Sequence, residues 1–172
     1  MKHLLIIGFL YLTVISVNAQ SKPYYPPTLG FVDDFENDFT ADERRELNSA
    51  IKDLLSQTME KAKLRGIEMA VVTVTDSMYG DSKEMSDYAT ALGDKWGLGT
   101  KEPNRGLIIA YSKKVRKVSI VTGSGFDQLL PREVCRSIID DKMAAEFRRG
   151  KPYDALYVGV KAIAAYLGIV IR

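Results

Sequence analysis

The chain has 172 residues, of which 46% are hydrophobic, enough to fill the core of one domain and too many for a disordered protein. Twenty-four Lys and Arg residues against 22 Asp and Glu residues give a net charge of +2. This even balance excludes a dedicated nucleic-acid-binding protein, which needs a clustered basic face. A single Cys excludes an internal disulfide bond and a cysteine-rich metal site.

Residues 1–19 have the pattern of a signal peptide. A short basic start precedes an apolar run over residues 4–17, and the small residues around Ala19 fit a cleavage site before Gln20. An uncleaved membrane anchor is the alternative, but a run of about 14 apolar residues is short for a bilayer span. We therefore expect an exported protein, periplasmic or secreted, whose mature chain starts at Gln20.

The only histidine, His3, lies inside this leader, so the mature chain contains none. Without an imidazole base, a Ser–His or Cys–His nucleophile pair is excluded, and so is a zinc site built from His and Cys. Acid–base or metal chemistry then falls to carboxylates, Lys, Tyr or the single thiol. Carboxylate oxygens prefer Ca²⁺ or Mg²⁺ to softer metals, so either ion is the cofactor that we expect.

The segment after the leader, residues 20–30, contains three prolines and a glycine and predicts an extended linker. Packing of Tyr24 and Tyr25 on the domain is the alternative. The folded domain is expected to comprise residues 31–172.

A capping box formed by Thr40 and Glu43 precedes apolar residues at helical spacing. Together they predict a long amphipathic helix that ends at Gly66. The β-branched run over residues 69–74 then predicts a buried strand. Residues 76–81 are expected to form a loop.

Residues 82–96 again show helical apolar spacing, and Gly97 is expected to end this second helix. Two further strands are predicted over residues 107–111 and 118–122, and their short connection implies an antiparallel hairpin. The turn between them is rich in Lys and Arg, which we interpret as a solvated tip that blunts a sheet edge. Binding of these basic side chains to an anionic surface is the alternative.

Pro131 opens a third helix whose apolar face includes Cys135, so this thiol is expected to be a buried hydrophobe rather than a nucleophile. A last helix begins at Asp154; Lys161 and its modest length argue against a membrane span, and none is expected in the mature chain.

Strand, helix and strand in succession favour a right-handed parallel crossover. We therefore predict an α/β fold, a three-layer α/β/α sandwich with a mixed, mainly parallel sheet and an antiparallel hairpin.

Ligand sites in open α/β sheets gather beyond the carboxyl ends of the strands. Asp76 follows the first predicted strand and Asp127 follows the third, while Asp33, Asp34 and Asp38 precede the first helix. These carboxylates are candidates for a shared cation site. Solvated loop acids and helix caps are the structural alternative.

A glycine-rich turn, Gly123-Ser124-Gly125, follows the third predicted strand. It resembles part of a phosphate-cradling loop but lacks a third glycine in Rossmann spacing and a Lys-Ser or Lys-Thr pair. We interpret it as a tight strand-to-helix turn with positive φ at glycine.

Seven segments, in this order and spacing, resemble the TPM domain family over the stretch from Phe31 to about Gly168. They are Val32-Asp33-Asp34-Phe35, Glu68-Met69-Ala70-Val71-Val72-Thr73-Val74, Tyr88-Ala89, Trp96-Gly97-Leu98-Gly99, Asn104-Arg105-Gly106-Leu107, Gly123-Ser124-Gly125-Phe126-Asp127 and Phe147-Arg148-Arg149-Gly150-Lys151-Pro152-Tyr153. The resemblance implies an exported α/β/α domain that often carries Ca²⁺ or a similar cation. Some members of the family are described as acid phosphatases, and others serve as accessory or repair proteins at membrane complexes.

The resemblance also singles out individual acids. Asp34 matches the acid of the family's Val-x-Asp opening, and Asp127 stands where many members have Glu. With Asp76, these residues form the metal site that we predict. Arg132 stands where many members have Asp, and this loss of an acid weakens the case for full metal coordination and for phosphatase activity.

Two functions follow as hypotheses. The first is an exported, divalent-cation-binding accessory or repair module whose partner is an envelope or membrane protein. The alternative is a metal-assisted acid phosphatase acting on phosphomonoesters, in which the cation polarises the phosphoryl group and Arg105 clamps its oxygens. The missing histidine and Arg132 favour the first hypothesis.

Overall fold

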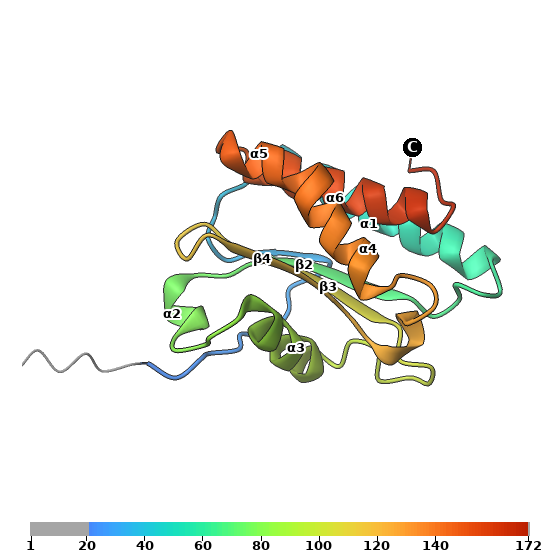
Figure 1. Cartoon of the computed structure of the whole chain (residues 1–172), viewed down its shortest axis with the longest axis horizontal. Coiled ribbons are helices and arrows are strands. Elements are labelled where there is room, and N and C mark those ends of the chain that lie inside the picture. Colours follow the sequence, from blue (N-terminus) through green and yellow to red (C-terminus); the bar gives the residue numbers. More distant parts are fainter. Residues whose placement is uncertain (1–20, 172) are drawn as a thin grey trace, which may run out of the picture.

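The computed structural model describes residues 21–171, so the predicted signal peptide lies outside the described residues. Within them the chain forms one four-stranded sheet with helices on both faces (Figure 1). In chain order the elements are β1 (Val32–Asp34), α1 (Ala41–Glu60), β2 (Glu68–Thr73), α2 (Asp76–Tyr79), α3 (Met85–Trp96), β3 (Gly106–Ser112), β4 (Lys117–Thr122), the 3-10 turn η1 (Ser124–Phe126), α4 (Arg132–Ser137), the π-helical segment η2 (Ile138–Met143), α5 (Ala144–Arg148) and α6 (Pro152–Tyr166).

The strands lie in the order β1-β2-β3-β4. β1 pairs with β2 in parallel, and so does β2 with β3, whereas β3 and β4 form an antiparallel hairpin. Helices α1 and α3 lie in the long connections that parallel pairing requires. The predicted α/β/α sandwich with a mixed, mainly parallel sheet is therefore confirmed.

Alternate side chains of the sheet enter two separate cores. On one face, Leu107 and Ile109 of β3 lie in a core shared with α1, α4, η2 and α6. On the other face, Ile108 and Ala110 lie in a core shared with α2 and α3. Figure 1 shows the two helical layers on opposite sides of the sheet. Because β2 and β3 are buried on both faces, they have the near-continuous apolar sequence of interior strands.

Two short elements differ from the prediction. β1 was missed because it is three residues long and contains two Asp, a residue type that is depleted in strands. It forms through its pairing with β2 rather than through local preference. The expected loop over residues 76–81 contains the short helix α2, which Thr75 caps by accepting a hydrogen bond from the Met78 N–H. A single turn is too short to show helical periodicity in the sequence.

The predicted capping box of α1 is present. The Thr40 side chain accepts a hydrogen bond from the Glu43 N–H, and the Glu43 carboxylate accepts one from the Thr40 N–H at 2.7 Å. The helix ends at Glu60, before the predicted end at Gly66, because the chain turns there and buries Leu64. The boundary is thus decided by a tertiary contact.

The C-terminal layer follows the prediction with shifted boundaries. The helix expected from Pro131 is present as α4, η2 and α5, and the last helix starts at Pro152 rather than Asp154. Cys135 is buried as predicted, with 4% of its surface exposed, and burial raises the pKa of its thiol to about 11. Among residues 21–171, no helix combines the length and apolar character needed to cross a bilayer.

The segment before β1 forms no helix or strand over residues 21–29, and it lies against the domain. The Tyr25 ring stacks on Tyr88 with ring centroids 5.2 Å apart, and the Tyr88 hydroxyl donates to the Tyr24 carbonyl at 2.8 Å. The Trp96 indole N–H donates to the Pro26 carbonyl at 2.7 Å. These contacts correspond to the alternative in which Tyr24 and Tyr25 pack on the domain.

Candidate functional site

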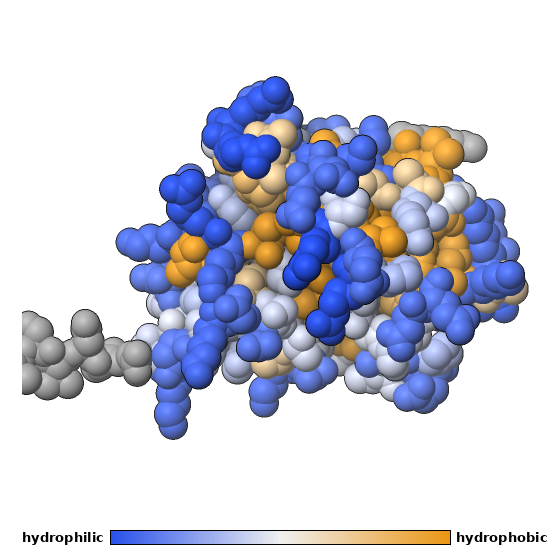
Figure 2. Space-filling model, viewed as in Figure 1, coloured by the Kyte–Doolittle hydropathy of each residue, from blue (hydrophilic) through white to orange (hydrophobic). Residues whose placement is uncertain are grey.

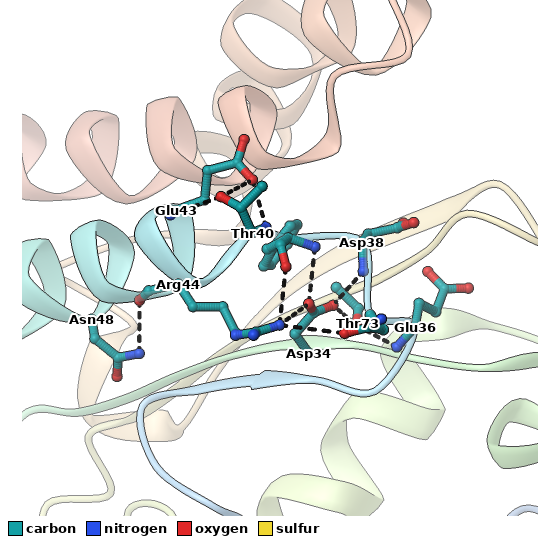
Figure 3. Close-up of polar contacts among 10 residues, drawn as sticks. Asp34, Glu36, Asp38, Thr40, Glu43, Arg44, Asn48 and Thr73 are labelled. Carbon is teal, nitrogen blue, oxygen red and sulfur yellow. Dashed lines mark hydrogen bonds and ion pairs between the residues drawn. The ribbon is translucent and has the colours of Figure 1, made fainter.

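Asp34, the first of the predicted metal ligands, ends β1, and only 1% of its side chain is exposed. Its Oδ1 accepts hydrogen bonds from the Asp38 N–H at 3.0 Å and the Thr73 hydroxyl at 2.9 Å. Its Oδ2 accepts from the Phe39 N–H at 3.0 Å and from the Arg44 guanidinium at 3.2 Å (Figure 3). Each oxygen therefore has two protein donors, and the carboxylate holds the turn before α1 against β2 and α1.

The next two acids contact the β3–β4 hairpin. The Glu36 carboxylate accepts from the Lys113 N–H at 2.9 Å and from the Ser112 hydroxyl at 3.1 Å, and burial raises the pKa of Glu36. The Lys113 ammonium donates to Asp38 Oδ1 at 2.8 Å, a contact that raises the pKa of Lys113. Part of the basic hairpin that we interpreted as a solvated tip is therefore paired with the loop before α1. Asp38 Oδ2 is buried and has no hydrogen-bond partner among residues 21–171.

Asp76 and Asp127, the other two predicted ligands, lie at opposite ends of the strands. Asp76 is exposed at the start of α2, beyond the carboxyl end of β2. Asp127 is also exposed, but it follows β4, which runs antiparallel to β3. Asp127 therefore lies near the start of β3, at the opposite end of the strands from Asp76. Among residues 21–171 no three His, Cys, Asp or Glu side chains are grouped to hold a metal ion. The structure does not bring the three carboxylates together.

Arg105, the predicted phosphate clamp, is half-buried and donates through its guanidinium to the Arg65 carbonyl. Beside it, the carbonyl of Asn104 accepts a hydrogen bond from the Gly125 N–H at 2.6 Å. A Cβ at Gly123 or Gly125 would overlap Asn104, so glycine is required there by close approach. Gly123 has a φ of −71°, which corrects the expectation of positive φ in this turn.

A second candidate site lies along β4, the last strand of the sheet. The Gly123 N–H donates to the Gly106 carbonyl at 2.8 Å, so these two residues form a hydrogen-bonded pair of the β3–β4 ladder. In an antiparallel ladder, every second residue of a strand directs its backbone groups to the neighbouring strand. By this alternation, the backbone N–H and C=O groups of Val118, Ile120 and Thr122 face away from β3. No residue between 21 and 171 is hydrogen-bonded to these outward groups.

An open groove of about 510 Å³, which we call the β4 groove, follows this free edge. Residues 119–122 of β4 line it between α3 on one side and α4 with η2 on the other. A smaller hollow of about 90 Å³ adjoins it at the start of β3 and shares Thr90, Val121 and Thr122 with it. In Figure 2, strongly hydrophilic side chains gather over α4, with hydrophobic surface on either side of them.

The two walls of the groove carry charges of opposite sign. α4 presents Arg132 and Arg136 to the β4 groove, and η2 adds Asp140 at the end of that wall. α3 presents Asp87 to the groove and Asp94 to the adjoining hollow. All five side chains are exposed, and none has an ion-pair or hydrogen-bond partner within the described residues. These charges are thus free to meet a partner.

Sequence reasoning missed the β4 groove because it searched the carboxyl ends of the strands. A signal was present, since residues 118–122 form the last predicted strand and only helices follow it. The outer edge of such a hairpin strand stays free unless an earlier strand pairs with it. Within residues 21–171 no earlier strand does so, because β1 and β2 lie on the other side of β3.

The sequence pattern of the TPM domain family matches residues 32–166, which is the stretch from the first residue of β1 to the last residue of α6. The solution NMR structure of the N-terminal domain of a protein from P. gingivalis is similar, with a TM-score of 0.66 and 27% sequence identity over 80% of this chain and 81% of that chain. A search of curated proteins gave no match. Because the family pattern spans every strand and every helix of the described structure, the chain belongs to the TPM domain family.

Proposed function

We propose that this TPM domain is an exported, non-catalytic accessory module that binds an extended segment of an envelope protein along the free edge of β4. The observation that supports it is the row of outward backbone groups of Val118, Ile120 and Thr122, of which Ile120 and Thr122 line an open groove. An extended segment in the groove would add a fifth strand to the sheet, and its backbone would satisfy these groups.

The physical basis of such binding is the hydrogen-bonding capacity of an unprotected edge. Each backbone hydrogen bond gained contributes about 0.5–1.5 kcal/mol net. Edge strands that must stay free of partners are usually guarded by charged side chains, by proline or by a bulge. The cation of β4, Lys117, donates to the Lys83 carbonyl and pairs with Glu84 at 3.4 Å, so it is held against the segment that leads into α3 rather than over the edge.

The chemistry expected from the sequence has weaker support. Divalent-cation binding stays a prediction. The geometry gives it little support, because Asp34 and Asp127 lie at opposite ends of the strands. For the phosphatase alternative, the oxygens of Asp34 already accept protein donors and the Arg105 guanidinium binds a backbone carbonyl. No contact in the described structure favours phosphoryl transfer over partner binding.

The variant Thr122→Pro tests the proposal. Proline removes an N–H that faces the groove and spares the bonds between β4 and β3, so the sheet is expected to stay intact. Peptides of about eight residues selected from a random display library are expected to slow hydrogen exchange at Val118, Ile120 and Thr122. They are expected to bind Thr122→Pro at least about tenfold more weakly than the parent chain.

Thr122→Val is the matched control, since it changes the side chain and keeps the N–H. Unchanged exchange protection of the β3 amides in Thr122→Pro reports that the fold is intact. Selected peptides that leave the outward β4 amides exchanging as in the free domain contradict the proposal.

A further inference from the structure

We infer that the β4 groove selects a strand of alternating charge, with acidic side chains toward α4 and basic side chains toward α3. This inference rests on the proposed function and adds the chemistry of the bound segment. Two features support it. The pleat of β4 directs alternate side chains of an added strand to opposite walls of the groove, and the two walls carry opposite charges.

The pleat is visible in the packing of β4 itself. Val118 and Ile120 pack in the core that α4 covers, whereas Val121 packs in the core that α3 covers. A strand added to β4 continues the same pleat, so its successive side chains point alternately to the two sides. Each wall of the groove therefore meets every second residue of the bound segment.

The α4 wall is suited to carboxylates. Arg132 and Arg136 are four residues apart, so they lie on the same side of the helix, one turn from each other. Both line the β4 groove, both are exposed, and neither guanidinium has a partner within residues 21–171. A guanidinium binds a carboxylate through two parallel hydrogen bonds, which favours Glu or Asp at the parity that faces α4. Asp140 limits this acidic preference to the part of the segment that lies over α4.

The α3 wall is suited to cations. Asp87, Thr90 and Asp94 recur at the spacing of one helix face and line the groove and its adjoining hollow. The two carboxylates have no partner in the described part of the chain. Lys or Arg at the parity that faces α3 would pair with them, and a hydroxyl or small residue would fit beside Thr90.

A second copy of β4 does not have this chemistry. Residues 117–122 contain no acid, so a paired copy would place only apolar or hydroxyl side chains, or Lys117, against Arg132 and Arg136. Lys117 beside either arginine would bring like charges together, which is unfavourable. The charge pattern therefore favours a different chain over self-association through this edge.

The test uses two fluorescent peptides of about eight residues and identical composition. One alternates Glu and Lys between valine and threonine ends, and the other carries its Glu residues and then its Lys residues as blocks. The block peptide places one acid and one base on each wall, so fluorescence anisotropy should show it binding about tenfold more weakly than the alternating peptide. Arg132→Glu combined with Arg136→Glu should weaken binding of the alternating peptide by a similar factor.

The matched control is Lys52→Glu combined with Lys63→Glu, which makes the same change in net charge at exposed positions outside the groove. This control is expected to bind the alternating peptide as the parent chain does. Equal affinity for the two peptides, or full affinity in the double arginine variant, overturns the charge assignment.

Hydrogen exchange distinguishes failure of the charge assignment from failure of strand addition. If both peptides protect the outward amides of β4 equally, the groove binds strands and only the charge assignment fails. If a peptide binds without protecting these amides, strand addition itself fails, and the proposed function fails with it. Binding of neither peptide overturns the inference as well.

Discussion

The carboxylate of Asp34 joins three parts of the domain that lie apart in the sequence. It accepts hydrogen bonds from the turn before α1, from Thr73 of β2 and from Arg44 of α1. A neutral side chain of the same shape cannot do this, because an amide offers one acceptor oxygen and brings two N–H donors. At this position the acid is explained by architecture.

We therefore expect Asp34→Asn to lower the free energy of unfolding by about 2–4 kcal/mol, since the new amide group faces donors and Arg44 loses its ion pair with Asp34. Urea denaturation measures the change. Asp76→Asn is the control, because Asp76 is exposed and its substitution should stay within about 0.5 kcal/mol. Equal midpoints for Asp34→Asn and the parent chain would show that the hydrogen bonds of Asp34 carry no stability.

At the scale of elements, α3 does more than cover one face of the sheet. Its Tyr88 and Trp96 bind the segment before β1 through backbone carbonyls, and the Tyr24 N–H donates to the Met78 carbonyl of α2 at 2.9 Å. A segment whose composition is typical of a linker is thereby attached to the domain. The attachment depends on a few polar contacts, so it can be loosened without unfolding the core.

Tyr88→Phe removes the hydroxyl that donates to the Tyr24 carbonyl and leaves the ring in place. The net loss is about 1 kcal/mol, so the Tyr24 amide should exchange about fivefold faster. Hydrogen exchange followed by NMR measures this rate. Tyr166→Phe is the matched control, because Tyr166 is exposed on α6. The same Tyr24 exchange rate in both variants contradicts the assignment.

At the scale of the whole molecule, one sheet serves two cores. Leu47 of α1 is fully buried in the first core and Leu92 of α3 in the second, and strands β2 and β3 supply side chains to both. Loss of packing on one face therefore weakens the sheet on which the other face depends. The domain should unfold as a single cooperative unit.

Leu47→Ala and Leu92→Ala are each expected to lower the free energy of unfolding by about 2–5 kcal/mol through the cavity that each leaves. In both variants the transitions followed by Trp96 fluorescence and by far-UV circular dichroism should coincide. Leu29→Ala, at a side chain that is 82% exposed, is the control with little effect. Separate transitions in either variant would show that the two cores unfold independently.

The candidate site shows where local reasoning stops. The antiparallel hairpin of residues 107–111 and 118–122 was predicted and is present as β3 and β4. Because β4 runs back along β3, the residues after it lie at the amino edge of β3, far along the sheet from Asp34. The predicted hairpin was therefore already evidence against a shared site for Asp34 and Asp127. This was not recognised, because β1 was not predicted and the position of Asp34 in the sheet was unknown.

Amphipathic spacing, the Thr40 capping box, the apolar strands and the family resemblance were enough to establish an α/β/α TPM domain from the chain alone. They sufficed because periodicity and capping act over a few residues, where the identity of each neighbour is known. The short strand β1, the full hydrogen bonding of Asp34 and the free edge of β4 required the assembled fold. Each depends on a partner many residues away, and pairing at that range is set by the competition of whole elements for the sheet.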